Sequence, residues 1–218
     1  NVGGINPAAV DVALKLGAVE VWMPSYHSLA HYKATGKMGG YGHQGADVTT
    51  NYPVKPITIL DGNGELIPEI WPILELVKQH DAILGTSHLG SEEGLKLIRA
   101  AREVGCRKVV LTHPFFAPPS CTIEQIKEAV ELGAFCEFCS GNALSPIPAP
   151  IPLELYKEAV DACGSENFII SSDTGHPRKT MAPETSRMFA QSLTYKGVKQ
   201  ADVERMLKDN YHKLLEID

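Results

Sequence analysis

The stretch AILGTSHLGSEEGLKLIRAAREVGCRKVVLTH, residues 82–113, decides the fold. It opens with a short apolar segment at 82–86 and closes with another at 107–112, and both are typical of β-strands. Between them, apolar residues recur at spacings of four and three, which predicts a helix over 92–104 with Ser91 as its N-cap. The order strand, helix, strand predicts a βα unit with parallel strands.

The same alternation continues on both sides of this stretch. Further strands are expected at 18–23, 134–139 and 168–172. Further helices are expected at 7–16, 66–79, 152–163 and 183–196, with a final pair over 200–215. The sequence TIEQ at 122–125 is a capping box, and it predicts a helix that ends near Leu132, before Gly133. After the first strand, strand starts lie about 25 to 34 residues apart, the length of a βα unit, so the fold class is α/β with parallel strands.

One connection is much longer than the others. Residues 25–64 separate the first two strands and are rich in Gly, Tyr and His. Long connections in compact domains are usually binding loops or lids, so this segment is interpreted as an insertion that acts as an active-site lid. A chain of 218 residues fits one core, and residues 1–218 are expected to form a single domain.

Composition excludes several classes of protein. The chain is 44% hydrophobic and 21% charged, and no apolar run approaches the roughly 18 residues that a membrane span requires. Its formal charge is −6 and its basic residues are scattered, which argues against a nucleic-acid partner. The five cysteines are an odd number, which favours a reducing, cytoplasmic compartment. Cys136 and Cys139 form a C-x-x-C inside an expected strand, where buried thiols are favoured over a zinc site.

Three of the expected strands end in the same way, with an apolar run, a small hydroxyl residue and then a potential metal ligand. These ligands are His88, His113 and Asp173. In a parallel α/β fold the carboxyl ends of all strands open onto one face, so these side chains are expected to converge. A single His after a strand is more often an ordinary loop residue, and a single Asp is often an N-cap. The recurrence at three strand ends favours a shared site.

Two imidazoles and one carboxylate suit a divalent metal, with zinc as the first choice and manganese or iron as alternatives. Such an ion lowers the pKa of a bound water, and a nearby carboxylate such as Asp173 can take the proton. The chemistry expected at these strand ends is therefore hydrolysis.

Short motifs at these positions resemble the amidohydrolase superfamily of metal-dependent hydrolases, in a poorly characterised branch. They are GTSH at 85–88, VLTHP at 110–114, SSDTG at 171–175, DNY at 209–211, and the opening GGINP at 3–7 with VWMP at 21–24. The resemblance implies a TIM-type (β/α)8 barrel in which His88 ends the fifth strand, His113 the sixth and Asp173 the eighth. It further implies that all three are metal ligands and that His113 and Asp173 are catalytic, with Asp173 as general base.

The chain departs from this family's pattern in three respects. The family carries an H-x-H pair after its first strand, and this sequence contains no H-x-H. Five strands are expected where a barrel needs eight, so three strands, roughly 60 residues, are expected to precede Asn1 or to lie in a separate chain. The fourth strand of many family members carries a bridging Lys, whereas this one ends in Met23 and Pro24, which favours a single metal.

Further residues are expected to contact a small-molecule substrate. His31 is the first of them because it follows the Trp-Met-Pro strand of the family branch, and it is preferred over His27 and His43 of the same insertion. His176 and Arg178 lie just past the third strand-end ligand and could bind a substrate carboxylate. Glu137 lies in the middle of an apolar strand and is expected to face the barrel centre. These substrate-binding candidates are His31, His176, Arg178 and Glu137.

The leading hypothesis is a hydrolase of a small molecule that carries an amide, cyclic amide, ester or lactone, with the C–N bond taken from the family alone. Decarboxylation on the same metal scaffold is a related variant. The contrasting hypothesis is a noncatalytic, degenerate barrel that serves as a binding or assembly module. A nucleotide-binding sheet ranks last because the chain has no G-x-G-x-x-G and no P-loop. An incomplete barrel exposes an apolar edge, so a homo-oligomer or association with the missing N-terminal segment is expected.

Overall fold

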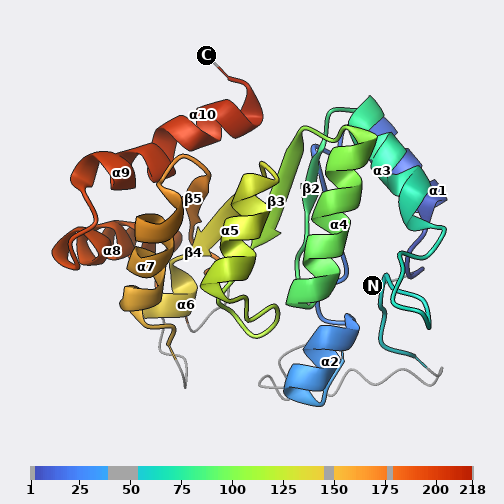
Figure 1. Cartoon of the computed structure of the whole chain (residues 1–218), viewed down its shortest axis with the longest axis horizontal. Helices are drawn as coiled ribbons and strands as arrows, with labels where there is room; N and C mark the ends of the chain where they lie inside the picture. The colour runs from blue at the N-terminus through green and yellow to red at the C-terminus, as the bar shows by residue number, and fades with distance from the viewer. Residues whose placement is uncertain (1–2, 39–53, 145–149, 176–178, 218) are drawn as a thin grey trace. The chain divides into compact units, whose positions relative to one another are not determined.

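The computed structural model describes residues 3–38, 54–144, 150–175 and 179–217 (Figure 1). Contacts divide the chain into two compact units. Unit 1 comprises Asn1–Leu111 and Ala117–Ser120, and unit 2 comprises Thr112–Phe116 and Cys121–Asp218. Both units are built from parallel strands with helices between them, and the strand order β1-β2-β3-β4-β5 is that of the sequence.

Unit 1 holds the first strands of the sheet. They are β1 (Glu20–Trp22), β2 (Ile83–Gly85) and β3 (Lys108–Thr112), whose last residue belongs to unit 2. The strands are parallel, with Val21 opposite Leu84 and Leu84 opposite Val109. All of β2 and most of β3 are buried, as expected of strands in a parallel sheet with both faces covered. The helices are α1 (Pro7–Lys15), α2 (Leu29–Thr35), α3 (Ile70–Gln79) and α4 (Ser91–Val104).

Helices α3 and α4 pack against each other beside β2 (Figure 1). Ile70, Ile73, Leu74 and Val77 form the buried stripe of α3. The N-cap of α4 is Gly90, so the prediction of Ser91 was wrong by one residue. The cause is Glu93, whose carboxylate accepts a hydrogen bond from the Gly90 amide and so extends the first turn back by one position.

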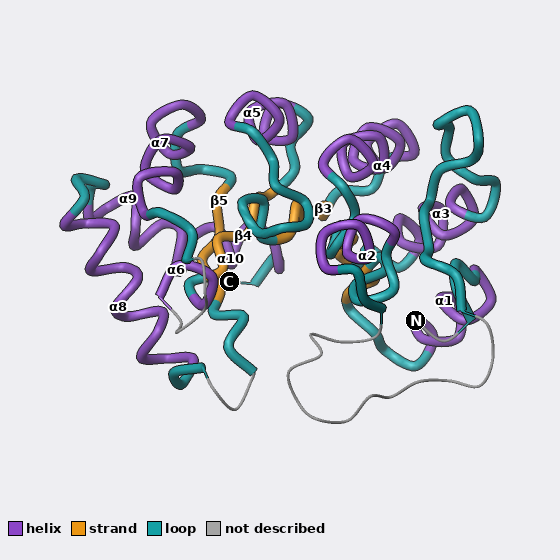
Figure 2. Tube along the Cα trace, turned by 90° about the horizontal axis from the view of Figure 1, so that it is seen from below, coloured by secondary structure: helices purple, strands orange, loops and turns teal. Residues whose placement is uncertain are grey.

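Unit 2 contains β4 (Phe135–Cys139) and β5 (Phe168–Ser171), which pair in parallel. Its helices are α5 (Ile123–Glu131), α6 (Gly141–Leu144), α7 (Leu153–Cys163), α8 (Ala182–Tyr195), α9 (Gln200–Glu204), the π-helical turn η1 (Arg205–Asp209) and α10 (Asn210–Leu215). Helices α6, α7 and α8 lie together in this unit (Figure 2). Its core is aromatic, because Phe138 stacks on Phe168 at 4.5 Å between ring centroids and Tyr156 meets Phe138 edge-on at 5.0 Å.

The capping box predicted at the start of α5 is confirmed in both directions. The amide of Gln125 donates to the Thr122 hydroxyl at 3.2 Å, and the amide of Thr122 donates to the Gln125 side chain at 3.0 Å. The helix ends at Glu131, and Gly133 takes a positive φ of 83° that lets the chain turn into β4.

All five predicted strands are confirmed, and each predicted helix is found within a few residues of its expected bounds. The α/β class with parallel strands is therefore confirmed. The sequence did not predict α2, which lies in the insertion at 25–64, or the short helix α6. Within the described ranges, no helix has the length and hydropathy needed to cross a membrane.

Candidate metal and catalytic site at the strand ends

The chain takes the same unusual backbone conformation after three strands. Ser87 has φ 51°, His113 has φ 31° and Asp173 has φ 47°, in the left-handed region that residues other than glycine rarely adopt. Such conformations cost free energy and are found most often where a side chain must be held for function. All three residues belong to the strand-end motifs in which the sequence predicted ligands.

In unit 1, His88 is paired with His31. Their Nδ1 atoms lie 3.1 Å apart, and their rings stack at 5.1 Å between centroids. Ser28 joins the two residues, because its hydroxyl donates to the His88 carbonyl at 2.6 Å and accepts from the His31 amide at 2.9 Å. Tyr26 meets both rings edge-on. The described contacts therefore fix the positions of both rings.

This pairing bears on the chemistry of His88. His31 is fully buried, and burial lowers its pKa, so its ring is neutral at neutral pH. A neutral His31 can accept a hydrogen bond at Nδ1. The tautomer in which His88 donates from Nδ1 leaves the lone pair of its Nε2 for another ligand, which is how a hydrogen bond orients a metal-binding imidazole.

In unit 2, His113 follows β3 and is 6% exposed. Burial lowers its pKa to about 4, and the charge of Asp173 offsets this only in part. The ring is therefore neutral at physiological pH, which is the form that binds a metal ion. Phe116 packs edge-on against it at 5.2 Å between ring centroids.

Asp173 follows β5, and its side chain is 46% exposed. Lys179 holds this turn, because its Nζ donates to the Asp173 carbonyl at 2.6 Å and lies 3.7 Å from Oδ2. The sequence reasoning did not identify Lys179. Lys179 lies six positions after Asp173, and a spacing of six residues in a loop predicts no contact.

The other candidates have different outcomes. Glu137 lies in the middle of β4 opposite Ile169 and is half-buried, and its substrate contact stays a prediction. His176 and Arg178, like His43, lie outside the described residues. Cys136 and Cys139 are buried free thiols, as predicted, and burial raises their pKa values well above the usual range.

The predicted three-residue ligand set is divided between the units: His88 belongs to unit 1, and His113 and Asp173 belong to unit 2. Among the residues that the structure describes, no group of three or more His, Cys, Asp or Glu side chains is arranged to hold a metal ion. The complete metal site therefore stays a prediction.

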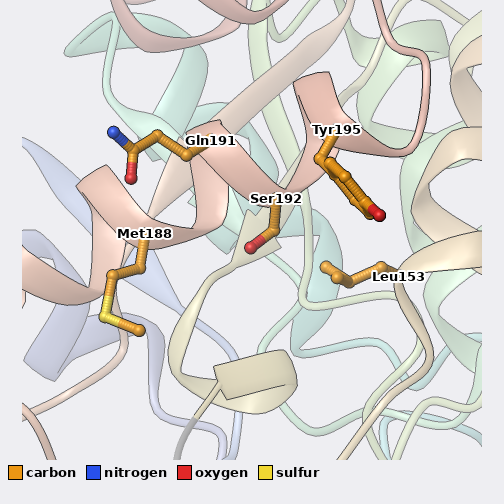
Figure 3. A pocket seen from close by; sticks show the side chains of 5 residues that line it. All are labelled: Leu153, Met188, Gln191, Ser192 and Tyr195. Carbon is orange, nitrogen blue, oxygen red and sulfur yellow. The ribbon is translucent and has the colours of Figure 1, made fainter.

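A pocket of about 400 Å³ lies elsewhere in unit 2 (Figure 3). It is lined by Leu153 of α7 and by Met188, Gln191, Ser192 and Tyr195 of α8. No strand-end residue contributes to this lining, so the pocket is not part of the candidate site.

Residues 1–137 match the model of DUF6282, a family of unknown function. The chain belongs to this family. The match includes β1, β2, β3 and both strand-end histidines of the DUF6282 chain. No curated protein matches it.

Solved structures are similar to the DUF6282 chain at low sequence identity. An amidohydrolase from Pseudomonas aeruginosa has a TM-score of 0.61 and 15% identity, over 97% of this chain and 68% of that one. The organophosphorus hydrolase of Deinococcus radiodurans has a TM-score of 0.55 and 12% identity, over 68% of this chain and 51% of that one. A mutant PTE-like lactonase from Deinococcus radiodurans has a TM-score of 0.54 and 12% identity, over 68% and 53%.

The chain thus spans about half the length of the organophosphorus hydrolase. At this level of identity the likeness concerns the fold. The α/β fold class is confirmed, and the predicted likeness to amidohydrolases extends to the fold of one solved amidohydrolase.

Proposed function

We propose that this chain contributes the larger part of the active site of a metal-dependent hydrolase that acts on a small molecule with an amide, cyclic amide, ester or lactone bond. His88, His113 and Asp173 would hold the divalent ion, for which zinc is the first choice. Asp173 would also be the general base. The observation that carries the proposal is the buried, neutral imidazole of His113 beside the accessible carboxylate of Asp173.

The imidazole nitrogens of His88 and His113 suit a divalent ion such as zinc. Imidazole nitrogen binds zinc only when it is neutral, and burial keeps His113 neutral at physiological pH. His88 is held from its Nδ1 side by His31, which favours ligation through Nε2. When bound, a divalent ion would supply Lewis-acid activation of water and of the substrate carbonyl.

The protein groups would do the rest of the chemistry. Asp173 is accessible enough to accept the proton of an attacking water and to return it to the leaving group. Lys179 fixes the main chain of Asp173 and so holds the carboxylate at the end of β5. Decarboxylation on the same residues would release carbon dioxide, which separates it from hydrolysis in a product assay.

The metal content of the intact protein tests this proposal. We expect bound zinc, manganese or iron in the purified protein, and loss of most of it in His88→Ala and in His113→Ala. His80→Ala is the matched control, because His80 caps the end of α3 at an exposed position. Unchanged metal content in both ligand variants, or no divalent ion in the unaltered protein, would refute the proposal and favour the noncatalytic binding module.

A further inference from the structure

Three buried side chains at the carboxyl ends of β4 and β5 each carry a polar atom without a hydrogen-bond partner among the described residues. They are Ser140, Asn142 and Thr174, which are 0%, 1% and 7% exposed. Within the described part of the chain, Ser140 Oγ, Asn142 Nδ2 and Thr174 Oγ1 have no hydrogen-bonding atom within reach. We call these three residues the polar cluster.

The polar cluster lies on two turns that are in direct contact. The amide of Ser140 donates to the Ser171 carbonyl at 2.9 Å, and the amide of Gly141 donates to the Ser172 carbonyl at 2.8 Å. A Cβ on Gly141 would lie 2.6 Å from the Ser172 oxygen and 2.8 Å from Thr174 Cγ2. The side chain of Thr174 therefore packs against the glycine that separates Ser140 from Asn142.

A folded chain rarely leaves polar groups in this state. Burying a hydroxyl or an amide without a partner costs free energy, and buried polar atoms are satisfied in the large majority of cases. Thr185 shows the usual arrangement in the same unit, because this residue is also buried and its hydroxyl donates to the Met181 carbonyl at 3.2 Å. Three exceptions on two adjoining turns, next to Asp173, indicate groups that are satisfied by something other than the described residues.

The chemistry of the cluster defines its ligand. Two hydroxyls and one amide NH₂ all donate hydrogen bonds, and none carries a charge. The nearby ammonium of Lys179 is engaged with Asp173. Uncharged donors fit an uncharged acceptor oxygen better than a carboxylate, which would need a cation when it is buried.

We propose that Ser140, Asn142 and Thr174 form a subsite for the neutral carbonyl of a lactone or cyclic amide, and that this subsite positions the substrate beside Asp173. The inference rests on the proposed hydrolase function, since it takes Asp173 as the catalytic group. It narrows the substrate class to compounds that present an uncharged carbonyl oxygen, for which the lactone and the cyclic amide are the cases proposed.

The test compares two isosteric variants of the intact protein, Thr174→Val and Thr185→Val. The probe is 2-pyrrolidinone, a stable lactam, and its binding is measured by NMR titration, with pyrrolidine as the analogue without a carbonyl. In Thr174→Val we expect an unchanged or higher melting temperature, because no hydrogen bond is lost, and about 5- to 10-fold weaker lactam binding. In Thr185→Val we expect a melting temperature about 2–4 °C lower and unchanged lactam binding.

Three results would overturn the subsite. They are no lactam binding by the unaltered protein at any concentration it tolerates, equal lactam binding in Thr174→Val, and a fall in melting temperature in Thr174→Val that matches Thr185→Val. The last result would mean that an ordered water already satisfies the hydroxyl.

Measuring the metal content alongside lactam binding shows whether the subsite, the hydrolase function, or both are wrong. A metal-loaded protein in which Thr174→Val changes nothing would remove the subsite and keep the hydrolase. Lactam binding that depends on Thr174 in a protein without metal would keep the subsite and remove the hydrolase.

Discussion

Replacing Asn210 tests how the C-terminal helices hold β5. Asn210 begins α10 and is 3% exposed, and its Nδ2 donates to the Ser165 carbonyl at 2.7 Å and to the Phe168 carbonyl at 2.6 Å. Both carbonyls lie at the start of β5, in residues that are almost fully buried. One side-chain amide therefore satisfies two buried acceptors that water cannot reach.

The expected cost follows from those two bonds. Removing the donor leaves the buried Phe168 carbonyl unsatisfied, at about 1–3 kcal/mol, and costs the Ser165 carbonyl one bond, at about 0.5–1.5 kcal/mol, because that carbonyl still accepts from the Phe168 amide at 3.4 Å. Asn210→Ala should therefore lower the free energy of unfolding by about 1.5–4.5 kcal/mol. Asn210→Asp keeps the size and shape but sets a carboxylate against two carbonyl oxygens, so its cost should be at least as large. Tyr211→Phe is the milder comparison, because it removes the hydroxyl that donates to the Ile170 carbonyl and should cost about 1 kcal/mol.

Urea unfolding of the intact protein, followed by far-UV circular dichroism, measures these differences, and an unchanged m-value shows that the unfolded state is the same. The decisive comparison is the isosteric variant. If Asn210→Asp unfolds within about 0.5 kcal/mol of the unaltered protein, which is the range of a neutral surface substitution, the two hydrogen bonds do not stabilise β5 as argued.

Gly141→Ala should cost about 1–3 kcal/mol of stability in thermal unfolding, because the new methyl would lie 2.6 Å from a backbone carbonyl that cannot rotate away; equal stability would contradict the close approach. Asp81→Asn should cost about 0.5–1 kcal/mol at neutral pH, since a hydrogen bond from Lys108 lowers the pKa of the partly exposed Asp81 carboxyl. A carboxyl whose pKa is lowered by folding stabilises the fold at pH values above its pKa in the unfolded chain. This stabilisation is lost as the pH falls through its pKa in the folded state, so the unfolding curves of the two proteins should converge below about pH 4. His31→Ala should weaken metal affinity about 10- to 100-fold by releasing the His88 ring, and equal affinity in a chelator competition would exclude this role.

The fold was predictable because several independent features of the sequence predict the same strands and helices. Apolar runs, helical spacing and the Thr122 capping box agree on the strands and helices of the βα units. The helix α2 was missed because it is seven residues long and lies in a segment interpreted as a lid. Its ends did carry a signal, since Ser28 caps the start and Gly36 follows the end in a left-handed conformation.

The candidate site was predictable only in part. Parallel topology is enough to suggest that His113 and Asp173 lie at equivalent strand ends, and their electrostatic interaction in unit 2 agrees with this. Roles for Lys179 and Thr174 could not be predicted from the sequence, because these roles depend on tertiary contacts. Whether a buried hydroxyl has a partner is decided by which turns are packed against it, and no periodicity encodes that.

The two ends of β5 differ in how well their polar groups are hydrogen-bonded. At its amino end, polar groups are saturated: Asn210 satisfies two carbonyls, and the Ser165 hydroxyl donates to Asp202 at 2.7 Å and accepts from Arg205 at 2.6 Å. At its carboxyl end, Asp173 has a positive φ and the neighbouring polar cluster lacks partners among the described residues. In α/β barrels the amino ends of the strands serve stability and the carboxyl ends serve catalysis. The proposed hydrolase would use the carboxyl end of β5 in this way, because the hydrogen bonds at the amino end stabilise the strand against the strained backbone at its other end.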